Sequence, residues 1–259
     1  MIDKKMSEKD YRQAEGLSNS FMIQFDRSPA HAFMVKEPTD AQKFGTMFHS
    51  FVLQPEQFKK DYLIIDKVDK RTKEYKSVVE ENPDKIIVFL DDFLILQKMR
   101  DNLLNVNIGF FKFSAYLDTP YKETSIFWEG QGVKQKARLD LFYERNGQPN
   151  IIVDLKTTQS AIDFVWSVKN YKYYRQNAWY KDGLETIIKK PDTEFYFIAC
   201  ETVEPYGVKV YQLSENYIML GRTENFIAIE KYKKWVENGS DKTIIYDNNI
   251  ETIEKPAYL

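Results

Sequence analysis

The sequence has one cysteine, Cys200, and two histidines among 259 residues. A lone cysteine cannot form an internal disulfide, and it cannot supply the several thiolates that an iron–sulfur cluster or a cysteine-ligated zinc ion needs. No run of about 18 apolar residues is present, so we expect no membrane-spanning helix. The first 16 residues are charged and lack the apolar stretch of a secretion signal, which predicts a cytoplasmic protein.

The sequence also lacks a strong charge of either sign. Its 37 Lys and Arg residues against 39 Asp and Glu residues give a net charge of −2. This balance excludes a basic protein that coats DNA with its whole surface, so any contact with nucleic acid must come from a local group of cations. Internal repeats and Gly/Ser/Pro-rich linkers are absent as well, and we expect one continuous domain over residues 1–259.

Helical patterns occupy the first half of the sequence. The polar run at residues 18–20 is a good N-cap and predicts a helix after it. Apolar residues between 44 and 52 recur at helical spacing, which predicts a helix with one buried stripe that ends before Pro55. Residues 90–105 predict another helix, whereas the charged segment 66–76 has no periodicity and is expected to be a loop.

The second half begins with three segments of β-strand character. They cover residues 123–128, 134–144 and 150–156, and turn signals at 130–132 and 146–147 separate them. Such short connections predict an antiparallel meander.

Helical and β-strand patterns alternate after the meander. A helical region is expected at about 161–190, then strands at 194–200 and 207–213, then an amphipathic helix at 215–237. This order predicts an α/β (α+β) fold, in which the meander and further strands form a mixed central sheet flanked by helices.

Asp154 and Lys156 lie at the end of the third strand of the meander. Residues two apart in a strand face the same side, so the carboxylate and the ammonium project together. A carboxylate-bound metal with a lysine that steers or deprotonates water needs this arrangement. The tripeptide is common by chance, as Asp3-Lys4-Lys5 illustrates, and the alternative interpretation is an exposed ion pair.

Asp140 lies in the neighbouring strand, from which its carboxylate can reach a metal beside Asp154. Oxygen ligands with waters left in the shell suit Mg²⁺, for which Mn²⁺ can substitute. Arg138 shares a strand face with Asp140 and could hold a phosphate, a 5′-phosphate first of all. The alternative for Arg138 is an ion pair with Glu123 or Glu144 on the strand surface.

Two residues on the helix after the meander, Gln176 and Tyr180, are four apart and share a face. Gln can orient a water or a base edge, and Tyr can donate to a phosphate. Lys172 falls near the same stripe and could contact DNA. The alternative is ordinary packing of an aromatic side chain in the core.

His49 lies at the edge of the apolar stripe of its predicted helix, one turn after Gly45. A histidine there is either a metal ligand or a hydrogen-bonded boundary residue. A glycine inside a helix costs about 1 kcal/mol relative to alanine, so Gly45 indicates that something packs close to it.

Four short motifs, taken in order, resemble the PD-(D/E)XK nucleases of the RecB-like branch, and most closely the phage and prophage exonuclease VIII (RecE-type) group. The resemblance extends over nearly the whole chain. The motifs are Gly45-x-x-x-His49, Lys136-Ala-Arg-Leu-Asp140, Asp154-Leu-Lys156-Thr-Thr158 and Gln176-x-x-x-Tyr180; further similar segments are Leu17–Ser20 with Ser28-Pro29, Phe44–Phe58, Glu123–Trp128 and Glu204–Tyr206.

The resemblance implies a restriction-endonuclease-like core and a set of roles for these residues. Asp140, Asp154 and the Leu155 carbonyl would bind the catalytic metal ions, and His49 would be a further ligand. Lys156 would orient or activate the attacking water. Gln176 and Tyr180 would support the site and the substrate strand. Weaker assignments are Glu123 as a metal ligand, by position alone, and Lys136, Lys172 and Arg27 beside Arg138 as phosphate contacts.

The same resemblance implies an activity. The group digests linear double-stranded DNA from 5′ ends, leaving 3′ single-stranded tails for a strand-annealing partner in recombination, and it forms ring-shaped oligomers around DNA. Two departures are present. Leu139 precedes Asp140 where relatives often have Pro, and Asp154 stands where many have Glu. Neither removes a ligand.

Three other functions compete with this interpretation. A catalytically silent DNA-binding module of the same fold would not need Lys156 among metal-binding acids. A CRISPR-type nuclease with an iron–sulfur cluster would need more thiolates than Cys200 offers. A glycosidase could use Asp140 and Asp154, but Lys156 would lower the pKa of the required general acid.

Overall fold

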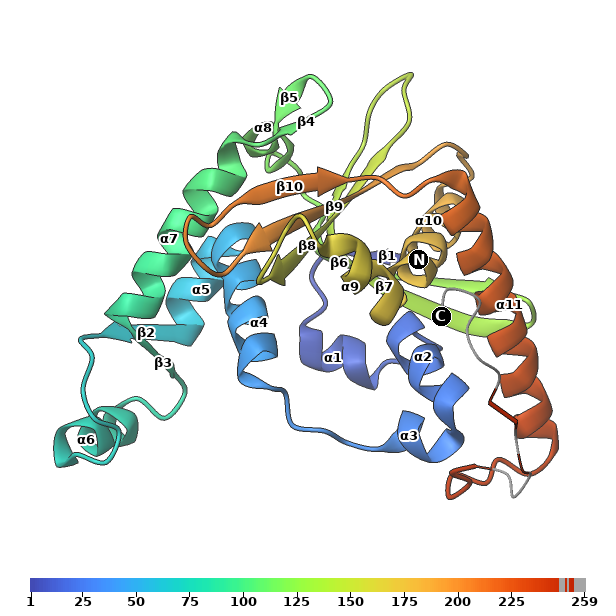
Figure 1. Ribbon diagram of the computed structural model, residues 1–259, viewed down its shortest axis with the longest axis horizontal. Coiled ribbons are helices and arrows are strands. Elements are labelled where there is room, and N and C mark those ends of the chain that lie inside the picture. The colour runs from blue at the N-terminus through green and yellow to red at the C-terminus, as the bar shows by residue number, and fades with distance from the viewer. Residues whose placement is uncertain (247–249, 251, 254–259) are drawn as a thin grey trace.

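A six-stranded mixed sheet forms the centre of the computed structural model, which describes residues 1–246, 250, 252 and 253 (Figure 1). The strands lie in the order β1-β6-β7-β8-β9-β10, and neighbours are antiparallel except for the parallel pair β8–β9. Their bounds are Ile2–Asp3 (β1), Lys122–Gly130 (β6), Val133–Tyr143 (β7), Ile151–Thr158 (β8), Glu194–Glu201 (β9) and Val208–Tyr211 (β10).

Helices cover both faces of this sheet (Figure 1). On one side lie α2 (Asn19–Arg27), α9 (Phe164–Asn170), α10 (Tyr173–Ile188) and α11 (Glu215–Glu237); on the other lie α4 (Asp40–Leu53), α5 (Pro55–Asp61), α7 (Leu90–Asn105) and α8 (Phe113–Tyr116). Shorter or peripheral elements are α1 (Glu8–Gln13), α3 (Pro29–Phe33), α6 (Lys73–Glu81) and the strand pairs β2–β3 (Tyr62–Ile65, Ile86–Phe89) and β4–β5 (Asn107–Ile108, Phe111–Lys112). Within the described part of the chain, no helix has the length and apolar character to cross a membrane.

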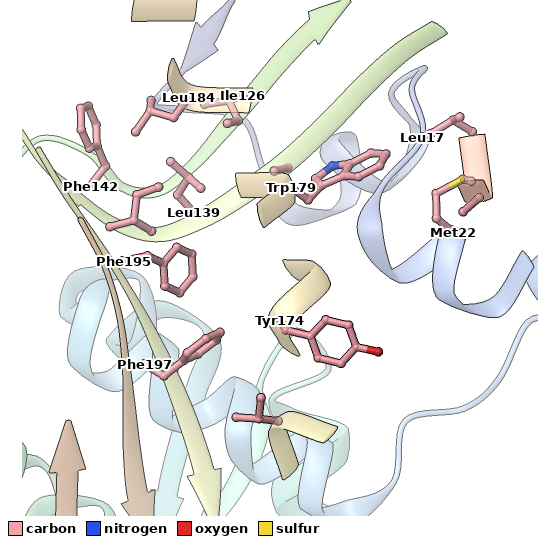
Figure 2. Close-up of a cluster of buried hydrophobic side chains, with 14 of the residues drawn as sticks. Leu17, Met22, Ile126, Leu139, Phe142, Tyr174, Trp179, Leu184, Phe195 and Phe197 are labelled. Atoms are coloured by element: carbon pink, nitrogen blue, oxygen red, sulfur yellow. The ribbon is translucent and has the colours of Figure 1, made fainter. Parts of the chain in front are cut away.

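Each face of the sheet has its own hydrophobic core, because alternate residues of a strand point to opposite sides. In β8, Ile152 packs toward α10, whereas Val153 and Leu155 pack toward α4 and α7. Figure 2 shows part of the core on the α10 side, where Trp179 lies close to the strands. Other labelled members of this core include Met22, Leu139, Leu184, Phe195 and Phe197.

The predicted mixed sheet flanked by helices is confirmed, and so are the meander, the later strands and the helices at 90–105 and 215–237. One local prediction needs correction: the segment 66–76 is not all loop, because Thr72 caps α6 from residue 73. The helix expected to end before Pro55 does so, and Pro55 then begins α5, since proline suits the first helical position. The sequence did not predict the parallel pair β2–β3.

Candidate active site

The site forms where β7 and β8 separate. Their pairing covers Leu141–Tyr143 opposite Ile151–Val153 and stops there, although β8 continues to Thr158. Beyond this point the backbone of Leu155 is satisfied by side chains instead. Its N–H donates to Asp140 Oδ2 (2.8 Å), and its carbonyl oxygen lies 2.9 Å from His49 Nε2. Asp154 and Lys156 are therefore interior strand residues beside a fork in the sheet, which corrects the expected strand end.

Glu123 reaches the same place through an unusual backbone conformation. Its φ is +50°, in the left-handed region, and it is missing from the β6–β7 ladder between the paired residues Lys122 and Thr124. A non-glycine residue costs free energy in this region, and such strain concentrates at functional sites. The kink lies opposite Asp140 and accompanies the turn of the Glu123 carboxylate toward His49.

His49, Glu123 and Asp140 form a group whose possible ligand atoms all lie within 4.8 Å of one another. His49 Nδ1 is 3.5 Å from Asp140 Oδ2 and 3.8 Å from Glu123 Oε1. One imidazole nitrogen and two carboxylates, with the Leu155 carbonyl beside them, are donors that Mg²⁺ or Mn²⁺ accepts. The donor set thus fits a divalent cation, and Glu123, the weaker candidate from sequence, belongs to it.

The residues of this group shift one another's pKa values. Burial, together with the nearby Asp154 and Glu123, raises the pKa of Asp140 to about 7 even though His49 opposes the shift. Burial alone would lower the pKa of His49, but Asp140 and Glu123 outweigh it and raise that pKa to about 9. Burial would raise the pKa of Glu123, yet His49 and Arg138 bring it below its ordinary value. A protonated imidazole thus provides the positive charge that these carboxylates require.

Asp154 is only 2% exposed and is held by two partners. Its Oδ2 accepts a hydrogen bond from Gln176 Nε2, and its Oδ1 forms an ion pair with the Lys156 ammonium. Among the described residues, no donor makes a well-directed hydrogen bond to Oδ1, so this buried oxygen is balanced by the charge of Lys156. Asp154 lies outside the three-residue group, because its carboxylate is turned to Lys156 and Gln176.

Lys156 is held in its charged form. Burial would lower its pKa, but Asp154 and then Tyr173 and Asp140 raise it above the ordinary value. The ammonium also lies 4.8 Å from the ring centroid of Tyr173, close enough for a cation–π contact. A protonated lysine donates hydrogen bonds and positive charge, so this geometry favours orientation of water or phosphate over removal of a proton.

Gly45 lets α4 approach β8. A Cβ at this position would lie 3.1 Å from Thr157 Oγ1, which is tighter than ordinary van der Waals contact. The close neighbour expected from the sequence is therefore Thr157. The approach matters because His49, one turn further along α4, reaches the Leu155 carbonyl.

Three further residues expected at the site, Gln176, Tyr180 and Arg138, lie in it or close to it. Gln176 belongs to the site because its side chain donates a hydrogen bond to Asp154. Tyr180 lies one turn further along α10, where burial raises the pKa of its hydroxyl and keeps it protonated. Arg138 lies at the site, but it takes the alternative role of an ion pair with Glu123 (Nε–Oε2 3.0 Å) and also donates to Met6 O and Ser125 Oγ.

Three residues that were expected to contact phosphate do not belong to the group of His49, Glu123 and Asp140. Lys136 Nζ donates to backbone carbonyls of Tyr11, Arg12 and Ala14, so it holds the end of α1 against β7. Lys172 pairs with Glu224 (3.3 Å). Arg27 contacts Gln24 at the exposed end of α2. Each cation has a local or tertiary partner that the strand and helix periodicities could not reveal.

Sequence reasoning also missed residues that shape the site. Tyr173 packs against the Lys156 ammonium, and residues 4–8 join the wall of a cleft of about 830 Å³ that contains His49, Glu123, Arg138 and Asp140. The only sequence signal at residues 4–8 is the pair Lys4-Lys5. Met6, which follows this pair, accepts a hydrogen bond from Arg138, more than a hundred residues away in the chain, so no local pattern could connect them.

In the PD-(D/E)XK nuclease superfamily, a mixed sheet carries an aspartate on one strand and an acid-x-Lys motif on the neighbouring strand. This chain has that fold and those motifs, with Asp140 on β7 and Asp154-Leu155-Lys156 on β8. More specifically, residues 18–249 match the model of a PDDEXK-like domain of unknown function (DUF3799), and the chain belongs to that family. A crystal structure from Eubacterium rectale, described as a "putative exonuclease", is similar with a TM-score of 0.64 and 16% identity, covering 97% of this chain and 96% of that one. Among curated proteins, no match is found.

The position of His49 gives a testable prediction. His49→Gln should raise the divalent-metal concentration needed for half-maximal cleavage roughly 10- to 100-fold, because a donor beside Asp140 and Glu123 is lost. A metal titration of the rate measures this. An unchanged titration with a lower melting temperature would instead assign His49 the role of a structural boundary residue.

Proposed function

We propose that this protein is a metal-dependent nuclease that hydrolyses phosphodiester bonds of DNA. One observation carries the proposal: the fork between β7 and β8 brings Asp140, Glu123 and His49 together on the floor of a cleft, with Asp154 and Lys156 beside them. Burial raises the pKa of Asp140 to about 7, so a cation bound beside this carboxylate would favour its charged form. The Lys156 ammonium, which pairs with the buried Asp154, lies beside this group and would donate a hydrogen bond to the attacking water.

The roles follow from the contacts. His49, Glu123, Asp140 and the Leu155 carbonyl would hold the metal ion, with Asp154 Oδ1 as a further donor. A bound divalent ion supplies Lewis acidity for the scissile phosphate and lowers the pKa of water. Lys156 would donate to the attacking water or the phosphate. Gln176 fixes the Asp154 carboxylate, and Arg138 fixes that of Glu123.

The finer proposal concerns the substrate and the biological setting. We propose digestion of linear duplexes from their ends, in the 5′ to 3′ direction, with Mg²⁺ as the cofactor and Mn²⁺ as a substitute. The motif resemblance to exonuclease VIII-type enzymes supports this, as does the description of the similar Eubacterium rectale protein. The same resemblance supports a ring-shaped homo-oligomer and a strand-annealing partner in recombination. The proposals of a single domain and of a cytoplasmic location rest on the sequence instead.

Digestion of three DNA substrates tests the exonuclease proposal. Linear duplexes labelled at the 5′ or the 3′ end and a covalently closed circle are incubated with Mg²⁺. Early release of the 5′ label, late release of the 3′ label and an intact circle are expected. Cleavage of the circle would indicate an endonuclease. Binding of DNA without cleavage of any substrate would favour the silent DNA-binding module.

The cleft wall provides a prediction on substrate binding. Lys4 and Lys5 line the cleft, and both are exposed. Lys5→Glu should weaken duplex binding in Ca²⁺ several-fold at low salt and reduce the slope of log K against log salt by about 1, since one phosphate contact is lost. Lys9→Glu is the matched control, because Lys9 is exposed on α1 but does not line the cleft. Equal effects of both variants would mean that the cleft does not bind DNA.

A further inference from the structure

A second cleft, of about 620 Å³, begins where β8 ends. It lies between α4 and α9, which flank the carboxyl end of β8 in Figure 1. Residues 157–159, which directly follow Lys156, form its floor. The remaining lining residues are Asp40, Ala41, Phe44, Ile95, Phe164, Ser167, Tyr171, Tyr173 and Thr202.

Aromatic rings form a row along this cleft from the core to the solvent. Phe164, which is 1% exposed, lies with its ring centroid 5.7 Å from that of Tyr173 at an interplanar angle of 27°. Tyr171 continues the row at 5.6 Å and 32° from Tyr173, and it is 62% exposed. The row therefore ends in a ring that the protein leaves largely uncovered.

The inner end of the row is linked to the candidate active site. Lys156 Nζ lies 4.8 Å from the ring centroid of Tyr173, and Asp154 pairs with the same ammonium. The neutral polar residues of the lining, such as Thr157, Thr158 and Gln159, offer donors and acceptors at the edges of the aromatic row. Ring faces along the row and neutral polar groups beside it are features of a surface that binds single-stranded nucleic acid. Asp40 is the charged residue of the lining, and Lys156 contacts the row from outside it, through Tyr173.

We propose that this cleft binds unpaired bases of the DNA strand being cut, with a base stacked on Tyr171. This inference rests on the proposed nuclease function and names the form of the substrate: a strand end whose bases have left the duplex. Aromatic stacking tolerates any base sequence, which suits an enzyme that degrades DNA generally.

The composition of the lining favours bases over a hydrophobic protein partner, because neutral hydroxyl and amide groups lie beside the rings. The exposed aliphatic residues Ile162 and Val165 lie outside the lining. Lys169, also exposed on α9, lies with Nζ 5.8 Å from the ring centroid of Trp166 and adds positive charge to this helix. Charge and aromatic character thus occur together near the cleft.

Binding of two labelled oligonucleotides in EDTA tests the proposal, with fluorescence anisotropy as the measurement. One is a single-stranded 12-mer and the other has the same length but abasic positions throughout. Wild type should prefer the oligonucleotide that carries bases. Tyr171→Ala should weaken its binding roughly 5- to 100-fold and leave abasic binding unchanged. Tyr171→Phe should behave as wild type, because the ring rather than the hydroxyl makes the contact.

Phe110→Ala is the matched control, since Phe110 is a fully exposed aromatic residue between β4 and β5, outside the cleft. The proposal is wrong if wild type binds both oligonucleotides equally, or if Tyr171→Ala keeps the preference for bases. It is also wrong if Tyr171→Ala leaves DNA binding intact but changes the sedimentation coefficient, because the cleft would then be covered by a second copy of the chain.

The same proteins incubated with Mg²⁺ and linear duplex separate this inference from the proposed function. A preference for bases in EDTA without cleavage in Mg²⁺ would refute the nuclease and retain the stacking site. Cleavage in Mg²⁺ without a preference for bases would retain the nuclease and refute the stacking site.

Discussion

Asp140→Asn is expected to lower the rate of DNA cleavage by at least about 10³-fold while the protein stays folded. Asn keeps an oxygen that can accept the hydrogen bond from the Leu155 N–H, but it loses the charge that a divalent cation needs. The loss should therefore appear in catalysis and in metal affinity rather than in the fold. Single-turnover digestion of a linear duplex measures the rate.

The melting temperature of the same variant provides an independent readout. The pKa of Asp140 is raised to about 7 in the folded protein. Ionising a carboxyl whose pKa is raised on folding destabilises the fold as the pH rises from the unfolded pKa to the folded one. At pH 8 and without metal, Asp140→Asn should melt at the same temperature as wild type or higher. Added Mn²⁺ should stabilise wild type but not the variant.

Asp84→Asn is the matched control for this experiment, because Asp84 is an exposed aspartate in the wall of the same cleft but outside the fork. It should keep wild-type turnover and the stabilisation by Mn²⁺. Retention of more than a few per cent of wild-type turnover in Asp140→Asn would remove Asp140 from the metal site.

Lys156→Met is expected to reduce the single-turnover rate by roughly 10²- to 10⁴-fold, with duplex binding in Ca²⁺ nearly unchanged. The lysine is buried, charged and paired with Asp154, so it is placed to act on the reacting groups rather than to attract DNA from solution. Methionine preserves the length of the aliphatic stem and its packing against Tyr173.

Two measurements are compared for Lys156→Met: the cleavage rate in Mg²⁺ and the dissociation constant in Ca²⁺. Lys60→Met, at an exposed position of α5, is the control for loss of one positive charge. If binding and cleavage fall by the same factor, Lys156 is a phosphate contact, and its proposed action on the water is wrong.

The parts of the fold that follow local periodicity could be predicted from the sequence. Strands with alternating burial and helices with one apolar stripe carry their own signal, which is why the meander and the helix at 90–105 were found. Short elements such as β2 and β3 lack enough residues for a period, and α5 begins at Pro55 almost directly after α4 ends at Leu53. The pairing of β2 with β3 depends on tertiary contacts, and the break between α4 and α5 depends on a single residue.

The site likewise has residues that could be placed from the sequence and features that depend on the tertiary structure. Asp140, Asp154 and Lys156 could be placed near one another because neighbouring strands in a meander share an edge. The fork could not be predicted, since it depends on where the β7–β8 pairing stops and on the left-handed conformation of Glu123. For this reason Glu123 ranked below Asp154 as a ligand, whereas the structure places Glu123 in the three-residue group.

The cations illustrate a further limit of sequence reasoning. A lysine or arginine on the right strand face is a reasonable phosphate contact until its partners are known. Lys136 instead binds carbonyls at the end of α1, and Arg138 binds Glu123. The carbonyl partners of Lys136, and the Met6 carbonyl that Arg138 also contacts, are set by the path of residues 6–14 along the sheet, which no periodicity in the first half of the chain encodes.

The most direct test of the central claim is digestion of a linear duplex by the wild-type protein with Mg²⁺ and with EDTA, followed on a denaturing gel. We expect progressive loss of full-length strands in Mg²⁺, no loss in EDTA, and recovery of cleavage when excess Mg²⁺ is restored. Cleavage that continues in EDTA, or intact DNA in Mg²⁺ and Mn²⁺ alike, would contradict a metal-dependent nuclease site at the β7–β8 fork.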